Sequence, residues 1–396
     1  MECLIVSPLE TAEEVVEVVE RKGLGHPDTI CDALAENFSR NLCREYRRRF
    51  GEILHHNVDK ALLCGGRASP AFGGGSVLAP IDIHLSGRAV TSVGQDELPI
   101  KEIAVEGSRA WLEANLHALD TTHHVEIHAL VRPGSQDLRE IFSRKTRGES
   151  PLANDTSIGV GYAPMSPLER LVLAIEKRIN RRPRRDPAWG EDVKVMGVRC
   201  GGKLSVTVAC AMIAGELACL DEYLAAKAAV ADLVREAAIE HGFSGCEVEV
   251  NAADNPAEGA IFLTVTGTSA EAGDDGQVGR GNRINGLITP SRPMSLEAAA
   301  GKNPISHVGK IYNVVAREIA EALVAKVSEI AAAQCLMVSR IGKPLTSPAV
   351  LQVKLATHDG FPPVKLEGPV DEIAAHCLGR LSMLVDDFVA GTIEIF

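Results

Sequence analysis

The sequence has few aromatic residues and no excess of positive charge. Aromatic residues make up 4% of its 396 residues, so we expect no stacking platform for single-stranded nucleic acid. Lys and Arg number 41 against 53 Asp and Glu, which gives a net charge of −12. This balance argues against a broad nucleic-acid-binding surface, although it is compatible with a local basic pocket for phosphates.

Paired cysteine motifs and long apolar runs are also missing. The ten cysteines form no C-x-x-C pair, which argues against a zinc knuckle or a thioredoxin-type motif. No apolar run approaches the roughly 20 residues that span a bilayer, and the first 22 residues carry acidic side chains where a signal peptide carries basic ones. We therefore expect a cytoplasmic protein with reduced thiols and no membrane partner.

Helical and strand patterns are mixed along the chain without strict alternation. The periodicity predicts helices over 33–50, 99–117, 166–180, 221–241, 304–331 and 369–390. It predicts strands over 15–20, 58–64, 80–90, 123–131, 192–199, 203–213, 246–251, 260–266, 334–340 and 350–355. Two strands followed by one long helix recur, as in 192–213 then 221–241, and in 246–266 then 304–331. This pattern favours an α+β fold, with sheets covered by helices, over a doubly wound parallel sheet.

Two of four glycine-rich segments lie in the first 80 residues. In KGLGHPDTICD (22–32), a loop turns into a helix at His26, Pro27 and Asp28. The N–H groups at a helix start favour an anion such as phosphate, and Asp28 could hold a Mg²⁺ there. The segment CGGRASPAFGGGS (64–76) either wraps a phosphate or turns sharply, and its spacing excludes a Walker loop.

The other two segments combine glycine with charged residues. GDDGQVGRGNRINGL (273–287) offers the carboxylates of Asp274 and Asp275 and the guanidinium forks of Arg280 and Arg283. AAAGKNPISHVGK (298–310) places Lys302, His307 and Lys310 at a helix start, which again suits phosphate. Together the segments suggest a site for a polyphosphate with Mg²⁺, such as a nucleoside triphosphate.

The same segments resemble S-adenosylmethionine synthetases (methionine adenosyltransferases) of the archaeal type. The resemblance rests on ERKGLGHPDTICD (20–32), NDTSIGVGYAP (154–164), GDDGQVGRGNRINGLITPSRPMS (273–295) and GKNPISHVGKIYN (301–313). It implies that ATP, L-methionine and water give S-adenosylmethionine, pyrophosphate and phosphate. It also implies a homodimer with active sites at the interface, and the use of Mg²⁺ and usually K⁺.

The resemblance implies one unit over residues 1–396, built from three intertwined repeats with pseudo-threefold symmetry and internal boundaries near 140 and 270. It also assigns roles to individual residues. The catalytic group is His26, Lys203, Arg280 and Lys302. The nucleotide-binding group is Gly134, Ser135, Asp137, Asp155, Arg283, His307 and Lys310. Asp274 is assigned to the substrate, and Asp28 and Asp275 to the metal ion.

Two departures from the bacterial and eukaryotic pattern stand out. Thr29 follows GHPD where that class has Lys, so one phosphate contact must differ. Arg67 stands where that class has a Glu of its K⁺ environment, which leaves the K⁺ requirement open. Two alternatives also stay open: an ATP-dependent phosphotransferase, and a non-catalytic regulatory homologue.

Overall fold

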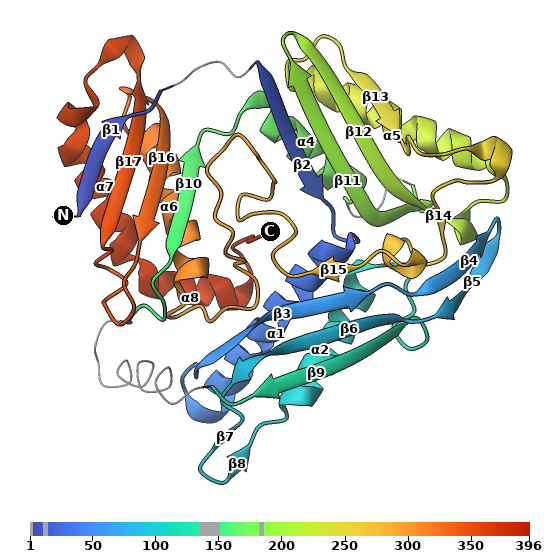
Figure 1. Ribbon diagram of the computed structural model, residues 1–396, viewed down its shortest axis with the longest axis horizontal. Coiled ribbons are helices and arrows are strands. Elements are labelled where there is room, and N and C mark those ends of the chain that lie inside the picture. Colours follow the sequence, from blue (N-terminus) through green and yellow to red (C-terminus); the bar gives the residue numbers. More distant parts are fainter. Residues whose placement is uncertain (1–2, 11–14, 135–150, 182–185) are drawn as a thin grey trace.

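The computed structural model describes residues 3–10, 15–134, 151–181 and 186–396. Its main elements are three mixed sheets with helices packed on them. Loops fill the region where the three sheets and their helices meet (Figure 1). Among the described residues, no helix combines the length and apolar character needed to cross a membrane. The described parts of the chain also contain the short 3₁₀ helices η2 (Ala214–Glu216), η3 (Pro256–Glu258), η4 (Ser269–Ala272), η5 (His358–Gly360) and η6 (Pro363–Leu366).

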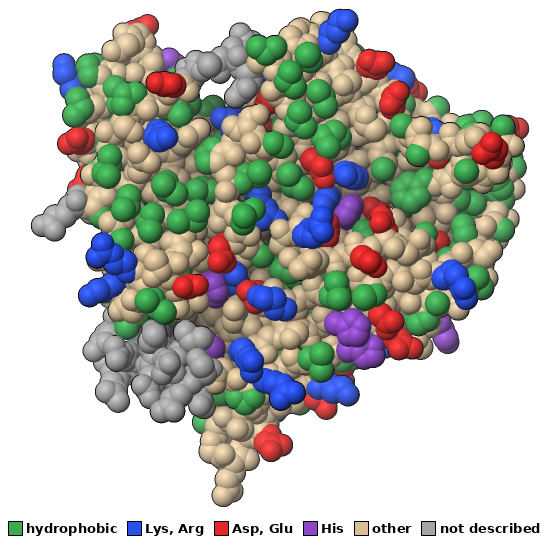
Figure 2. Space-filling model, in the orientation of Figure 1, with side chains coloured by type: hydrophobic (Ala, Val, Ile, Leu, Met, Phe, Trp, Pro, Cys, Tyr) green, Lys and Arg blue, Asp and Glu red, His purple; other side chains and the backbone are tan. Residues whose placement is uncertain are grey.

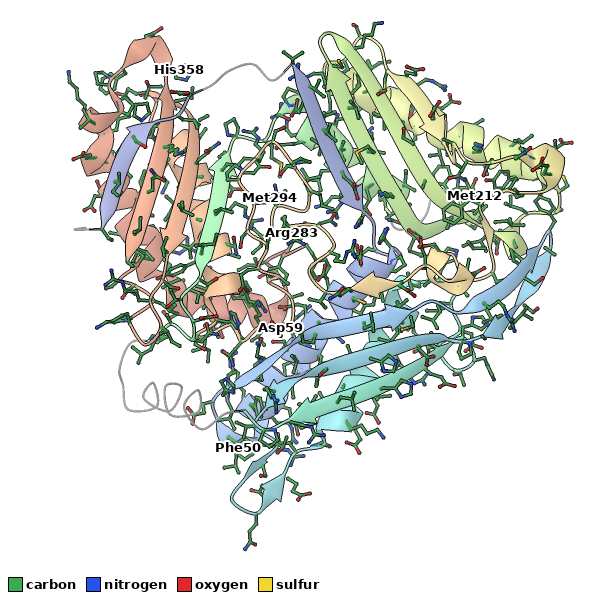
Figure 3. The ribbon with its side chains drawn as sticks, viewed as in Figure 1. Phe50, Asp59, Met212, Arg283, Met294 and His358 are labelled. Carbon is green, nitrogen blue, oxygen red and sulfur yellow. The ribbon has the colours of Figure 1, made fainter. Side chains whose placement is uncertain are left out.

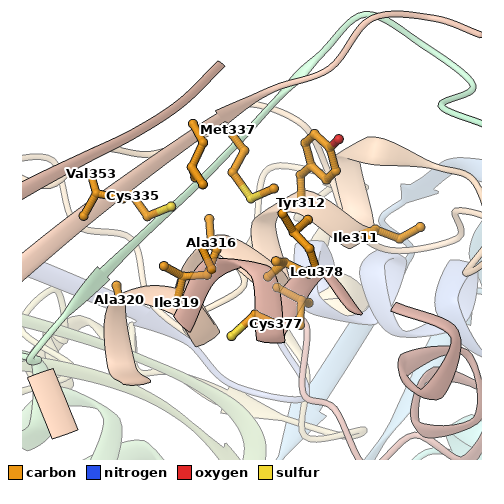
Figure 4. Close-up of a cluster of buried hydrophobic side chains, with 14 of the residues drawn as sticks. Ile311, Tyr312, Ala316, Ile319, Ala320, Cys335, Met337, Val353, Cys377 and Leu378 are labelled. Atoms are coloured by element: carbon orange, nitrogen blue, oxygen red, sulfur yellow. The ribbon is translucent and has the colours of Figure 1, made fainter. Parts of the chain in front are cut away.

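The first sheet has the strand order β1-β17-β16-β10 and packs against α6. Its strands and helices are β1 (Leu4–Pro8), β10 (Ile158–Ala163), β16 (Ile330–Val338), β17 (Val350–Thr357), α6 (Val308–Lys326), α7 (Glu367–Gly379) and α8 (Leu381–Ala390). Figure 4 shows Ile319 of α6 in the same core as Cys335 and Met337 of β16. A Cβ added to Gly161 of β10 would lie 2.2 Å from the Arg317 backbone nitrogen, so glycine permits this close strand–helix packing.

The second sheet has the order β13-β12-β11-β2, with β14 paired to β12. Its elements are β2 (Val16–Lys22), β11 (Trp189–Cys200), β12 (Lys203–Ile213), β13 (Glu247–Val250), β14 (Leu263–Thr264), α4 (Pro167–Ile179) and α5 (Leu220–Glu240). The start of α4 is a capping box in which Ser166 accepts from the Glu169 N–H and Glu169 accepts from the Ser166 N–H. The Ser-Pro-x-Glu sequence fixes that helix start locally.

The third sheet has the order β15-β3-β6-β9 and packs against α1 and α2. Its elements are β3 (His56–Cys64), β6 (Ile81–Ala89), β9 (Val125–Arg132), β15 (Gly276–Gln277), α1 (Pro27–Phe50) and α2 (Ile100–Asn115). Two hairpins extend from it, β4 (Arg67–Ala71) with β5 (Gly74–Ala79), and β7 (Ser92–Val93) with β8 (Asp96–Glu97). The glycine-rich segment 64–76 therefore forms a hairpin, whose turn uses the positive φ of Gly73 and Gly74.

The α+β fold expected from the sequence is confirmed. In each sheet two long strands precede a helix: β3 and β6 precede α2, β11 and β12 precede α5, and β16 and β17 precede α7. The strands within 246–266 and the helix within 304–331 do not form one such group. Strand β13 joins the second sheet, whereas α6 packs on the first. The boundary expected near 140 lies outside the described residues, and the one near 270 stays a prediction.

Candidate active site

The turn between β2 and α1 is fixed by its neighbours. Gly25 donates its N–H to the Glu191 carbonyl at 2.9 Å, and a Cβ at this position would lie 2.4 Å from the Asp192 nitrogen. His26 follows as the N-cap of α1, and its Nδ1 accepts from the Asp28 N–H at 3.2 Å. This leaves Nε2 to carry the proton of the neutral ring. Burial and the Lys22 ammonium lower the pKa of His26 to about 4, against the opposing effect of Asp28.

Asp28 joins this turn to the GDDGQVGRGNR segment. Its Oδ1 accepts from the Gln277 N–H at 2.9 Å, and its Oδ2 lies 2.8 Å from the Lys22 Nζ. Lys22 also donates to the Arg280 carbonyl at 2.9 Å. Lys22, His26, Asp28 and Arg280 therefore form one group, which we call the α1-start cluster. The Arg280 side chain is exposed, and its guanidinium has no ion pair within the described parts of the chain.

The glycines of this segment make room for α1. A Cβ on Gly276 would lie 2.3 Å from the Pro27 carbonyl carbon, and one on Gly281 would lie 2.5 Å from an Asp32 carboxylate oxygen. Asp32 is buried and accepts from the Gly279 N–H at 2.9 Å, and burial raises its pKa to about 7. These contacts show that the glycines let the loop touch the helix.

Arg283 turns into its own loop. Its guanidinium donates to the carbonyls of Gly279 at 2.5 Å, Gly281 at 2.9 Å and Ser295 at 3.4 Å. It also lines a pocket that opens to solvent between this loop and α6. Figure 3 shows Arg283 and Met294 together in the central loop region. In this position Arg283 holds the loop that carries Arg280.

Asp274 and Asp275 lie beside the end of β3. A Cβ on Gly65 would lie 2.7 Å from the Asp274 nitrogen, and the Gly65 N–H donates to Asp275 Oδ1 at 2.8 Å. Both aspartates are exposed. Their carboxylates are therefore two or three residues away from Gln277, whose N–H donates to Asp28.

The GKNPISHVGK segment forms a second group of charges around the start of α6. Lys302 Nζ lies 2.9 Å from Asp59 Oδ2 and 2.8 Å from Glu297 Oε2. Burial opposes the charge of Lys302, but the Asp59 and Glu297 carboxylates outweigh it and raise the lysine pKa. Lys310 is 1% exposed and contacts both oxygens of Glu36, at 2.8 and 2.6 Å. Lys302, Lys310 and their three carboxylates form what we call the α6-start cluster.

The two clusters share α1. Asp28 and Glu36 are eight residues apart on that helix, which separates them by about 12 Å along its axis. His307 is the N-cap of α6, where its Nδ1 accepts from the Gly309 N–H at 3.3 Å, and burial lowers its pKa. The Val308 N–H at this helix start donates to Asn154 Oδ1 at 3.1 Å, and exposed Asp155 is the next residue in the chain.

Lys203 is not brought to either cluster. It lies at the tip of the β11–β12 hairpin, where the register pairs it with Cys200, which in turn pairs with Val16. Lys22 pairs instead with Lys194, six residues or about 20 Å further along β11. Lys194 Nζ lies 3.5 Å from Glu20 Oε1, and the Lys194 charge adds to the lowering of the His26 pKa.

Sequence reasoning therefore missed Lys194 and Lys22. Both lie at polar positions of alternating strands, but only the pairing of β2 with β11 brings them together. Gly134 follows β9 and lies at the end of the third sheet where β3 begins. At the same end, Asn57 of β3 forms a β-bridge with Lys302. Ser135 and Asp137 lie outside the described residues.

Comparisons with known proteins identify the family of the chain. The family model for S-adenosylmethionine synthetase (AdoMet synthetase) matches residues 4–392. A probable S-adenosylmethionine synthase of Aquifex aeolicus is 51% identical over 387 residues, covering 96% of each chain. The S-adenosylmethionine synthase of Pyrococcus furiosus is 46% identical over 398 residues, covering 100% of this chain and 98% of the relative.

A solved structure shares the fold. An unusual S-adenosylmethionine synthetase from Campylobacter jejuni superposes with a TM-score of 0.64 at 13% identity, covering 96% of this chain and 94% of that one. The fold and the matched family model are those of a transferase family. The chain belongs to the S-adenosylmethionine synthetase family. Its activity is that of a methionine adenosyltransferase, as the sequence predicted.

Proposed function

We propose that the methionine sulfur attacks C5′ of ATP in a site built on the α1-start cluster. The cations of this cluster stabilise the negative charge of the departing tripolyphosphate. The observation that supports this is the convergence of Lys22, His26 and Arg280 around Asp28 at the start of a 24-residue helix. The leaving group gains negative charge as the C–O bond breaks. Fixed donors aimed at developing charge contribute most to such a step.

We assign the role of hydrogen-bond donor to His26. Its Nδ1 accepts from the Asp28 N–H, so the Nε2–H is left as a neutral donor. A pKa of about 4 keeps the ring neutral at physiological pH. Attack of the methionine sulfur on C5′ releases no proton, so this step needs no base. Neutral His26 therefore acts only as a hydrogen-bond donor.

The lysine missing after GHPD has a substitute in this proposal. Thr29 occupies that position, and its hydroxyl donates to the Lys22 carbonyl at 3.2 Å. Lys22 Nζ lies in the same cluster as Asp28 and the Arg280 carbonyl. We therefore assign to Lys22, together with Lys194, the phosphate contact that a lysine after GHPD makes in the bacterial and eukaryotic class.

Mg²⁺ fits the carboxylates of this site. Asp28 and Asp275 supply hard oxygen ligands beside cations that match phosphate, which is the donor set that Mg²⁺ takes together with phosphate oxygens. Bound there, the ion would neutralise charge on the polyphosphate. Asp28 would exchange its Lys22 partner for the ion, which frees the ammonium for a phosphate oxygen. A K⁺ requirement stays open, because exposed Arg67 supplies a fixed positive charge.

The remaining assignments complete the proposal. Asp274 binds the methionine substrate, while the α6-start cluster, with His307 and Asp155, holds the nucleotide. Gly134, Ser135 and Asp137 contact the nucleotide, and the protein works as a cytoplasmic homodimer with active sites at the interface. The ten free cysteines suit a reducing compartment.

The test incubates the purified protein with ATP, L-methionine and MgCl₂ and measures products by mass spectrometry. The proposal expects S-adenosylmethionine, pyrophosphate and phosphate in equal amounts. Phosphorylated methionine would instead indicate a phosphotransferase, and a folded protein without product would indicate a regulatory homologue. Omitting methionine is the control, since it separates synthesis from simple ATP hydrolysis.

A further inference from the structure

A group of histidine and acidic side chains lies on the third sheet, away from the α1-start cluster. Strands β6 and β9 are parallel, and their register places Asp82 opposite Glu126 and His84 opposite His128. Residues two apart on a strand share a face, so these four side chains form a square on one face. Ile81 and Ile83, which alternate with Asp82 and His84 along β6, point into the core. Figure 2 shows histidine and acidic side chains gathered on the surface over this sheet.

The square is compact enough to hold one ion. The ligand atoms of Asp82, His84 and His128 all lie within 4.8 Å of one another. His128 Nε2 is 3.4 Å from Asp82 Oδ1 and 3.9 Å from Glu126 Oε2, and the two imidazole rings stack with centroids 4.7 Å apart. Ligands of a tetrahedral zinc ion lie about 3.3 Å apart. Because these side chains are partly exposed, small rotations can close the difference.

We propose that Asp82, His84 and His128, with Glu126 beside them, form a metal site for a borderline transition ion such as Zn²⁺. Two imidazoles and a carboxylate are ligands that Zn²⁺, Co²⁺ and Ni²⁺ prefer, whereas Mg²⁺ prefers oxygen alone. The site is therefore chemically different from the one assigned to Mg²⁺. It links β6 to β9 across the sheet and is independent of the proposed reaction.

The test titrates full-length wild-type protein with ZnCl₂ by isothermal titration calorimetry, in a buffer that contains excess MgCl₂. A parallel titration with CoCl₂ follows the visible absorption of tetrahedral Co²⁺. We expect one Zn²⁺ per chain. His84→Asn and His128→Asn should each weaken binding by at least about tenfold, since each removes a ligand.

His123→Asn is the matched control. His123 Nδ1 also contacts a carboxylate, Asp120 Oδ2 at 2.7 Å, and both side chains are exposed. This variant should bind Zn²⁺ as the wild type does, and circular dichroism checks that all variants fold. The proposal is overturned if His84→Asn and His128→Asn bind Zn²⁺ like the wild type, if His123→Asn loses as much affinity, or if Mg²⁺ displaces the ion.

Discussion

Replacing Arg280 by Ala tests the phosphate-binding role of the α1-start cluster directly. The guanidinium is exposed, and nothing in the described parts of the chain forms an ion pair with it. Its loop is held by other groups, namely Lys22 on the Arg280 carbonyl and Arg283 on the carbonyls of Gly279 and Gly281. The substitution should therefore remove a charge from the site while changing the free energy of unfolding by less than about 0.5 kcal/mol.

The expected loss of activity follows from the charge. A unit charge about 4 Å from a phosphate oxygen, at an effective dielectric constant of about 20, contributes roughly 4 kcal/mol. Loss of one donor to a developing oxyanion costs about 10²–10³ in kcat, or roughly 2.7–4 kcal/mol. The two figures agree, so we expect Arg280→Ala to lower kcat by about 10²–10³. Its effect on the KM for methionine should be small, because the charge acts on the leaving group.

The assay measures S-adenosylmethionine synthesis and the hydrolysis of added tripolyphosphate separately. Arg280→Lys should recover only part of the rate, since an ammonium cannot form the planar fork. Arg235→Ala is the matched control, because Arg235 is 52% exposed on α5, where it forms an ion pair with Asp232 of the same helix. Near-normal rates of Arg280→Ala in both assays would refute its assignment to the phosphates.

Four further outcomes are expected. Lys22→Met should lower kcat for synthesis at least about tenfold and raise the Mg²⁺ concentration needed for half-maximal activity, which initial rates can test. Because burial lowers the pKa of His26 from about 6.5 in the unfolded chain to about 4 in the folded one, its contribution to stability is present above pH 6.5 and lost as pH falls toward 4. His26→Asn, which keeps an N-cap acceptor, should therefore flatten the fall of the denaturation midpoint over that range. Lys310→Met should cost about 3–5 kcal/mol in chemical denaturation by leaving the Glu36 carboxylate buried and unpaired, and adding Glu36→Gln should recover part of it. If Arg67 replaces the monovalent cation, activity in Na⁺ or choline buffer should stay within a few-fold of that in K⁺, whereas tenfold K⁺ activation would contradict it.

Local sequence was sufficient for the features that depend on near neighbours. The Ser-Pro-x-Glu start of α4 and the His-Pro-Asp start of α1 are set by residues within one helical turn, and both form as expected. The lysine of β11 was beyond this kind of reasoning. Lys203 and Lys194 are both polar residues on neighbouring strands, and only the register with β2 brings Lys194 to the site. A pattern that alternates every second residue carries no information on which end of a sheet meets the next unit.

The direction of a charged side chain was equally hidden in the sequence. Lys310 follows a Gly-rich helix start that suits phosphate, yet its ammonium is held by Glu36, 274 residues earlier in the chain. Arg280 and Arg283 are three residues apart in one motif, but one guanidinium is exposed and the other donates to backbone carbonyls. A basic residue near glycines can serve a ligand or the fold, and its partner decides which. Here Glu36 of α1 holds Lys310 and the loop's own carbonyls hold Arg283, whereas the exposed guanidinium of Arg280 is left for the substrate.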